Sequence, residues 1–364
     1  MTKRARLSFL FIFLLSMFAY NSMAEHPENT DDNTQHSDTH HEDGFKPGEF
    51  IFDHIGDSHE WHIITVKGHH VSVPLPIILY SKSSGISVFM SSKLAHGHHF
   101  KNFQYGEEEY KGEIIEINEH GEISVPLDFS ITKNVFAIFI SLALMLFLFF
   151  SISKSYKRAP CEAPKGLQNF LEPVILFIKD DVAIPSIGNK KYERFMPFLL
   201  TLFFFILINN LFGLIPIIPG GANVTGNIAV TLALALFTFF IQVFSGNKHF
   251  WKHIFNAPGV PWWLKIPIPL IPLIEFVGLL IKPFVLMVRL FANISAGHII
   301  ALGFFGLIFI FGQINVVAGY GISVLTVAFT IFMTCLELLV AFIQAYVFTL
   351  LSAIYFGMAV DNGH

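Results

Sequence analysis

The sequence predicts an all-α polytopic membrane protein with five membrane-crossing helices, the last two long and strongly tilted, plus a small exported, mostly β N-terminal domain. Of 364 residues, 53% are hydrophobic and only 14% are charged. A soluble domain averages about 25% charged residues, so most of this chain does not face water. Charge is also unevenly distributed, because between residues 266 and 360 the only charged residues are Glu275, Lys282, Arg289 and Glu337.

Residues 1–24 have the layout of a secretory signal peptide. Lys3, Arg4 and Arg6 precede a short apolar run that ends in small residues, among them Ala24. We expect cleavage after Ala24, because the apolar run is short for a membrane helix; an uncleaved first helix is the alternative. In both cases the residues that follow are exported.

Residues 25–130 are expected to form the exported region. Thirteen of the 17 histidines lie before residue 125, and the polar stretch 25–44 should be disordered. The later runs EWHIITV, GISVFMSS and GEIIEINEHGEISV predict strands, the last one a hairpin turning near Gly121. The histidines are irregularly spaced, so we favour a solvated, weakly metal-binding region over a defined metal site. Cys161 and Cys335 suggest neither a disulfide framework nor a zinc site.

Residues 131–364 are expected to form the membrane domain. The first span, 134–153, has enough residues to cross a hydrocarbon layer of roughly 30 Å. Basic residues from Lys154 to Arg194 place the next loop in the cytoplasm by the positive-inside rule. Within that loop, apolar residues recur at helical spacing over 167–178, which predicts a helix along the inner membrane surface or against partner subunits. Pro173 should split this helix or start it.

The middle spans, 195–217 and 228–245, carry no charge. The turn between them, PIIPGGANVTGN, has no Lys or Arg, as expected of an external loop. Lys248, Lys252 and Lys265 return the next loop to the cytoplasmic side. The last two spans cover 283–311 and 323–357. As helices they would be roughly 43 Å and 52 Å long, so they must tilt or bend.

Helical spacing groups the polar residues of these last spans. Glu275, Lys282 and Arg289 are seven residues apart and share one stripe, with Asn293 beside it. His298 lies nine residues after Arg289, on the opposite face. Glu337 and Gln344 are again seven apart on the last helix, and share a face there. Small residues beside Arg289 allow another helix to approach closely; they are Ala292, Ser295, Ala296 and Gly297.

A charge at mid-membrane costs about 2.5–3.5 kcal/mol even on lenient scales, so it usually faces an aqueous path or a partner charge. Arg289 cannot release its proton, but it can act as a fixed electrostatic barrier. His298 and Glu337 can titrate and could relay protons. The structural alternatives are an ion pair between Arg289 and Glu337, and a neutral His298 hydrogen-bonded between helices. For Gln344 the structural alternative is a hydrogen bond between helices. For Glu275 and Lys282 the alternatives are snorkelling to the membrane surface and pairing with each other.

The runs KPFVLMVRLFANISAGHI, LELLVAFIQAYVFTLLSAIYF and NNLFGLIP resemble the a subunit of F-type ATP synthases over about residues 130 to 360. The resemblance implies that Arg289 is the essential stator arginine facing the ring of c subunits, with Asn293 and Gln344 beside it. It also implies that His298 and Glu337 line the proton half-channels, with Glu275 and Lys282 as support on the cytoplasmic side. Many bacterial relatives have the acid at the first position and the histidine at the second. Their exchange here suggests that the two sites act together.

The resemblance further implies a bacterial inner-membrane subunit with a periplasmic N-terminal domain, a cytoplasmic C-terminus and no cofactor or metal. Its expected partners are the c-subunit ring, the b subunits of the peripheral stalk, the rest of the synthase, protons and lipid, but no nucleic acid. The chain is no enzyme by itself, since it has no GxxxxGK[ST] phosphate loop. A stand-alone ion-coupled transporter would predict internal repeats, and none is visible. A membrane-embedded hydrolase would need a catalytic constellation that the sequence lacks.

Overall fold

The computed structural model describes most of the chain after residue 55. All described residues belong to one compact unit, Phe45–His364. The predicted signal peptide 1–24 and the stretch 25–44 lie outside the described residues, so the expectations for both stay predictions. The described residues are 48, 56–66, 69–94, 98–106, 110, 112–118, 122–158, 165–215, 221–255 and 270–361.

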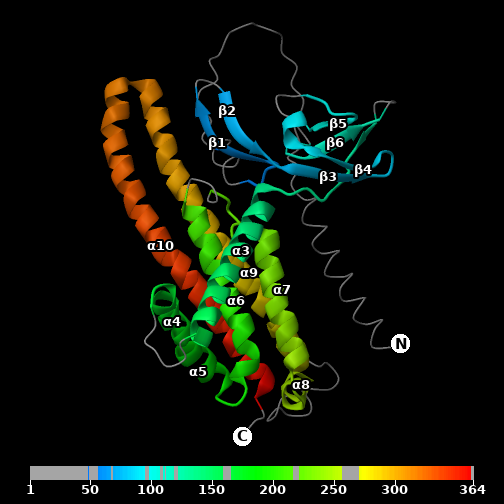
Figure 1. The fold of residues 1–364 in the computed structure, drawn as a ribbon, viewed down its shortest axis with the longest axis vertical. Coiled ribbons are helices and arrows are strands. Elements are labelled where there is room, and N and C mark those ends of the chain that lie inside the picture. Colours follow the sequence, from blue (N-terminus) through cyan, green and yellow to red (C-terminus); the bar gives the residue numbers. More distant parts are fainter. Residues whose placement is uncertain are drawn as a thin grey trace. The chain divides into compact units, whose positions relative to one another are not determined.

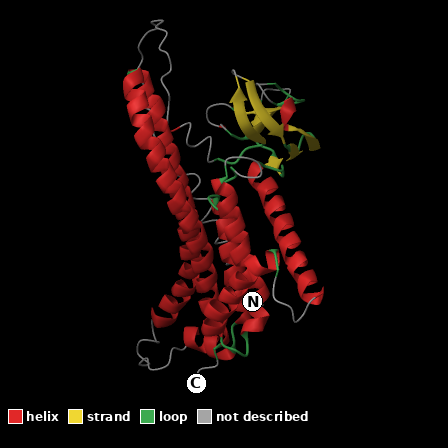
Figure 2. Cartoon of the chain, turned by 60° about the vertical axis from the view of Figure 1, so that its left-hand side comes forward, coloured by secondary structure: helices red, strands yellow, loops and turns green. Residues whose placement is uncertain are grey.

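Within these residues, five helices are long and apolar enough to cross a membrane, as predicted (Figure 1, Figure 2). The helix α7 has the predicted bounds, and α3 and α6 differ from theirs by at most five residues at either end. Helices satisfy every backbone group internally, which a bilayer requires. The five are α3 (Lys133–Arg158), α6 (Tyr192–Leu214), α7 (Ile228–Ser245), α9 (Leu270–Ile314) and α10 (Val316–Val360).

The predicted bounds of the last two helices are too short. Both α9 and α10 have 45 residues, or roughly 68 Å of helix. Pro283 lies inside α9 instead of starting it, and Asn315 alone separates the two helices, capping α10 by accepting a hydrogen bond from the Val317 amide. The glycines near this turn stay helical because they let the helices touch: a Cβ on Gly319 would lie 2.9 Å from Gly312 Cα. The extra length strengthens the expectation of a strong tilt.

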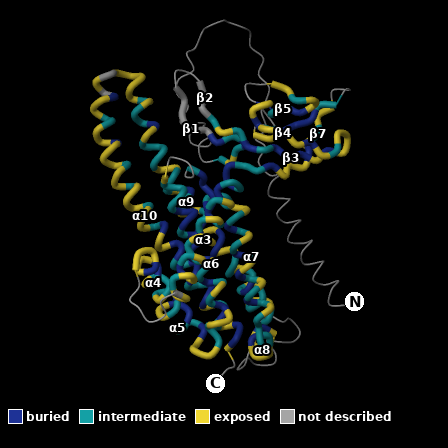
Figure 3. Tube along the Cα trace, in the orientation of Figure 1, coloured by how far each residue is buried: buried dark blue, intermediate teal, exposed yellow. Residues whose placement is uncertain are grey.

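The helices differ in how far their own chain covers them (Figure 3). In the most apolar stretch of α6, half of the residues are buried within this chain. In the corresponding stretches of α9 and α10, only 11% are buried. The core around α6 includes Leu199, Phe203 and Ile206, and Phe195 stacks on Phe356 of α10 with ring centroids 5.0 Å apart. The pair α9–α10 therefore leaves a long apolar face for lipid or a partner subunit to cover.

The loop after α3 forms α4 (Leu167–Phe177), a π-helical segment (Ile178–Ala183) and the short α5 (Ile184–Ile187). The prediction that Pro173 splits or starts this helix is wrong, because α4 continues through it. Leu171 and Ile178 are buried in the core on either side of the proline. This packing holds the helix together despite the one backbone hydrogen bond that proline removes.

The region before α3 is mostly β, as predicted, and all its strand pairs are antiparallel. Its core includes Ile77, Leu79, Phe89 and Phe103. The predicted hairpin is present as β6 paired with β7, although its turn lies outside the described residues. The strands are β1 (Glu60–Val66), β2 (His69–Pro74), β3 (Pro76–Ser81), β4 (Gly85–Met90), β5 (Phe103–Tyr105), β6 (Ile114–Ile117), β7 (Ile123–Ser124) and β8 (Leu127–Asp128).

One buried carboxylate lies between the small sheets. Glu116 of β6 is fully buried and accepts hydrogen bonds from four serine hydroxyls, of Ser81, Ser83, Ser84 and Ser124. Burial alone would raise the pKa of Glu116, but the four hydrogen bonds outweigh it and lower that pKa below its ordinary value. An ionised carboxylate thus joins β3, β6 and β7.

The described residues contain no group of three or more His, Cys, Asp or Glu that could hold a metal ion. His59 instead contacts Asp128 of β8, with Nε2 2.7 Å from Oδ2. Burial would raise the pKa of Asp128, yet hydrogen bonds from His59 and Ser130 lower it. Many histidines, His36, His40 and His41 among them, lie outside the described residues, so weak metal binding stays a prediction.

Candidate functional site

Arg289 lies on the uncovered side of α9. Its side chain is exposed, whereas Leu286, Met287 and Leu290 beside it are buried in the core. The alternative in which Arg289 pairs with Glu337 is not what the structure shows, since no ion pair of Arg289 occurs within the described residues and Glu337 contacts His298. A bare guanidinium on an apolar face is costly in lipid, so this face requires water or a partner carboxylate.

His298 and Glu337 come together from the two long helices. His298 Nδ1 lies 3.7 Å from Glu337 Oε1, and the side chains are only 17% and 14% exposed. His298 also packs against α6, since a Cβ on Gly213 would lie 3.3 Å from its Nε2. Glu337 Oε1 is buried without a hydrogen-bond partner. The contact is too long for a direct hydrogen bond, but it places an imidazole beside a carboxylate.

Asn210 of α6 connects this pair to a neighbouring loop, and sequence reasoning gave it no role. A narrow cavity is lined by His298, Glu337, Asn293 and Asn210. Asn210 donates to the Ala341 carbonyl at 3.1 Å, one turn beyond Glu337, so the amide holds α6 against α10. The only available signal was an uncharged polar pair, Asn209 and Asn210, inside an apolar span.

The described part of the α6–α7 loop extends the polar cluster. Thr225 donates to Asn210 Oδ1 at 2.7 Å, and Asn223 Oδ1 accepts from the Gly226 amide. Ser295 of α9 contacts the Gly226 carbonyl at 3.4 Å. Thr225 and Asn223 are almost fully buried. A line of buried polar groups therefore runs from this loop to the His298–Glu337 pair.

A second set of polar groups lies between α7 and α10. Thr238 and Ser352 have their hydroxyl oxygens 3.4 Å apart, and Gln242 is buried with neither amide atom hydrogen-bonded. Gln344, predicted beside the arginine, is also buried, two turns after Glu337 on α10. Buried polar atoms without partners, such as those of Gln242, are unusual in a protein interior. Together with the buried hydroxyls of Thr238 and Ser352, Gln242 indicates a polar route between α7 and α10.

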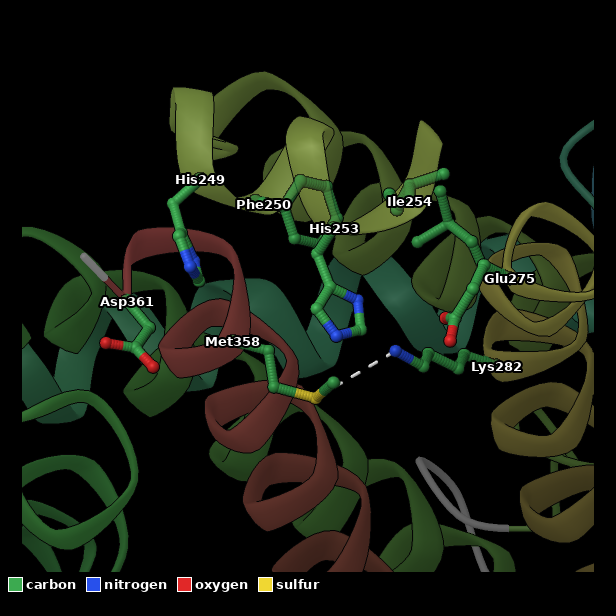
Figure 4. Close-up of a pocket in the computed structure, with 9 residues that line it drawn as sticks. His249, Phe250, His253, Ile254, Glu275, Lys282, Met358 and Asp361 are labelled. Atoms are coloured by element: carbon green, nitrogen blue, oxygen red, sulfur yellow. Dashed lines mark hydrogen bonds between the residues drawn. The ribbon is translucent and has the colours of Figure 1, made fainter. Parts of the chain in front are cut away.

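A pocket between the beginning of α9 and the end of α10 contains Glu275 and Lys282 (Figure 4). Lys282 Nζ lies 3.9 Å from Met358 Sδ and 5.3 Å from the centroid of the Tyr355 ring. Glu275 and Lys282 line the same pocket but form no ion pair within the described residues, so the pairing alternative stays a prediction. The amphipathic helix α8 (Lys248–Phe255) adds His249 and His253 to the lining, and α10 continues into Asp361, which also lines it. Sequence reasoning missed both histidines.

Comparison with known families shows which family this chain belongs to. The sequence pattern of the family described as ATP synthase A chain matches residues 135–357, which contain every predicted site residue. This chain belongs to the ATP synthase A chain family. It is accordingly a non-catalytic, multi-pass membrane subunit of that type, with a part in ATP synthesis and proton transport.

Relatives within the family are similar over about two thirds of this chain. ATP synthase subunit a of Chloroherpeton thalassium is 46% identical over 241 residues, which are 65% of this chain and 68% of the relative. ATP synthase subunit a 2 of Chlorobaculum tepidum is 44% identical over 254 residues, 66% and 68% of the two chains. ATP synthase subunit a of Myxococcus xanthus is 42% identical over 260 residues, 68% and 80%.

The β region in front of the A chain domain matches a second family. Residues 50–134 match a domain of unknown function (DUF8433), so the boundary between the two matches falls at the start of α3. The predicted division near residue 130 stays a prediction. The β region therefore matches a different family from the membrane helices, and its role has to be inferred from its own contacts.

One glycine of the A chain site provides a direct test of the His298–Glu337 geometry. A Cβ on Gly297 would lie 2.5 Å from Glu337 Oε1, closer than real Cβ contacts allow. We expect Gly297→Ala to displace the Glu337 carboxylate and to slow ATP-driven proton pumping about tenfold, because small displacements of reacting groups are costly. Gly303→Ala on the same helix is the control, since its Cβ would meet nothing within 4 Å. Equal rates for the two variants would contradict this geometry.

Proposed function

We propose that this chain supplies two proton half-channels and the essential arginine, Arg289, at its interface with the rotating ring of c subunits. It thereby couples proton translocation to ATP synthesis. The arrangement on α9 carries the proposal. Arg289 is on the uncovered face, while the titratable pair of His298 and Glu337 lies inside, about 14 Å further along the helix axis. A cation that cannot deprotonate is suited to be a barrier, and a carboxylate beside an imidazole to be a relay.

The outer half-channel is the polar line from the α6–α7 loop to Glu337. A proton passes Asn223 and Thr225, reaches the His298–Glu337 pair, and continues past Asn293 to a carboxylate on the ring. Once neutral, that carboxylate can rotate into lipid at low cost, because it no longer carries a charge. The exchange of acid and base relative to many bacterial family members is tolerated because the two groups lie 3.7 Å apart and act together.

Arg289 stands between the two paths. It attracts the ionised ring carboxylate after the proton has left, and its fixed charge repels protons that would otherwise pass straight through. Gln344 and Asn293 flank the arginine as polar neighbours. Each elementary charge that crosses about 100 mV contributes about 2.3 kcal/mol, so several protons are needed for each ATP.

The inner half-channel is the polar route between α7 and α10. It runs by Thr238, Ser352 and Gln242 to the pocket of Glu275 and Lys282, where protons leave to the cytoplasm. This orientation puts the β region in the periplasm and the C-terminus in the cytoplasm of a bacterial cell with an inner membrane. The c ring lies against the face of α9 and α10 that this chain leaves exposed. The b subunits of the peripheral stalk are expected to contact other helices.

Disulfide cross-linking tests the proposed ring interface. Ala296 is exposed on the Arg289 stripe of α9. In a Cys161→Ser, Cys335→Ser background, Ala296→Cys should cross-link to a cysteine next to the ring carboxylate. The cross-link should stop ATP-driven pumping until a reductant is added. Phe147→Cys, exposed on α3, is the matched control and should not react with the ring. Cross-linking at Phe147 and none at Ala296 would place the ring elsewhere and contradict the proposal.

A further inference from the structure

The start of the β region is fastened to the first turn of α3. The Asp57 carboxylate accepts hydrogen bonds from Thr132 Oγ1 at 2.8 Å and from the Asn134 amide at 3.1 Å. The Lys133 amide donates to the Ser58 carbonyl at 2.9 Å. Since the first amides of a helix lack partners within it, these contacts cap α3 with residues from the β region. Beside these contacts, His59 Nε2 lies 2.7 Å from Oδ2 of Asp128, a few residues before α3.

Trp61 extends this junction to a second part of the membrane domain. The indole is 4% exposed, and its ring packs edge-on against Phe136 of α3 with centroids 5.7 Å apart. It belongs to one buried cluster with Ala137 of α3 and with Ala222 and Val224 of the α6–α7 loop. Trp61 therefore joins the β region, α3 and the loop in a single apolar contact.

The loop has two kinds of buried residues in alternation. Ala222 and Val224 are fully buried in the Trp61 cluster, whereas Asn223 and Thr225 take part in the polar line. Thr225 bonds Asn210, and Asn210 bonds the Ala341 carbonyl one turn from Glu337. An unbroken series of contacts thus leads from the indole of Trp61 to the helix turn that carries Glu337.

We propose that Trp61 is a positioning residue of the outer half-channel, through which the β region holds the α6–α7 loop in place. By packing on Ala222 and Val224, the indole keeps Thr225 and Asn210 in the positions that pass protons to the His298–Glu337 pair. The inference rests on the proposed function, because it assigns a role within that half-channel. It gives the β region a task in the membrane domain: it fixes a loop whose buried apolar residues share one cluster with the indole.

The test measures proton pumping in inverted vesicles with a pH-sensitive dye, expressed per assembled complex. Trp61→Ala should lower the rate about tenfold and shift its dependence on lumenal pH, since the lumen corresponds to the outer side. Trp61→Phe keeps an aromatic ring and should stay within about twofold of the parent. Phe129→Ala is the matched control, because Phe129 lies in the same region but is exposed. A loss of assembly alone changes neither the rate per complex nor the pH profile.

A milder pair of variants tests the positioning role of Trp61 even where Trp61→Ala does not assemble. Thr225→Val removes the hydroxyl that bonds Asn210 at almost constant volume. Combined with Trp61→Phe, it should give an effect that differs from the product of the single effects, since both act through one loop. Multiplicative effects, or an unchanged rate and pH profile for Trp61→Ala, would overturn the inference. If Arg289→Gln still abolishes pumping in that case, the proposed function stands and only the role of Trp61 is lost.

Discussion

Arg289→Gln is expected to abolish ATP-driven proton pumping, by at least about a hundredfold, while the complex still assembles. Glutamine is polar but shorter and uncharged, so it could neither attract the ionised carboxylate of the proposed ring interface nor repel protons between the two proposed half-channels. The exposed position of Arg289 explains why assembly should survive. Its guanidinium lies outside the packed core of Leu286, Met287 and Leu290.

The measurement is acidification of inverted vesicles, with passive proton leak recorded in the same preparation. Loss of pumping together with increased leak would support the barrier role. Arg194→Gln is the matched control, because Arg194 is also exposed but lies at the start of α6 beside the Phe195 ring. Pumping at the normal rate in Arg289→Gln would mean that the arginine is only structural.

Glu337→Gln is expected to lower proton flux by a comparable factor, because glutamine keeps the shape of the side chain but carries no transferable proton. Since His298 lies 3.7 Å from this carboxylate, His298→Glu alone should also be impaired, with two acids confronting each other. The double exchange, His298→Glu with Glu337→His, restores one acid and one base. It should recover flux to within about tenfold of the parent.

Initial rates of pumping and passive flux should be compared between the parent and each variant at several pH values. Thr334→Ala, at an exposed position on the same helix, serves as the control. Unaffected flux in Glu337→Gln would remove this residue from the path. A double exchange no better than the single variants would show that the two residues act separately.

Much of the architecture was predictable from the sequence. A nearly uncharged apolar run has one stable conformation in a bilayer, so the spans around α3, α6 and α7 were located to within a few residues. The strands β1 and β4 followed from runs of β-branched and alternating residues. Helical spacing also placed His298 away from Arg289, as the structure has it.

Spacing could not predict contacts between elements. The lengths of α9 and α10 depend on glycines that pack across the hairpin, and the continuity of α4 through Pro173 depends on core contacts on either side. Neither effect is local. A propensity for turns or breaks is worth only about 1–3 kcal/mol, which tertiary packing can exceed.

The sequence by itself determined that five apolar spans form helices, that an arginine occupies a stripe with Glu275 and Lys282, and that His298 faces elsewhere. It did so because residues on one helix are related by a fixed rotation of about 100°. Only the tertiary structure decided that His298 meets Glu337, that Asn210 links Thr225 to Ala341, and that Trp61 packs on the α6–α7 loop. These contacts join residues far apart in the chain, and what selects them is the complementary packing of whole surfaces, which no local pattern records.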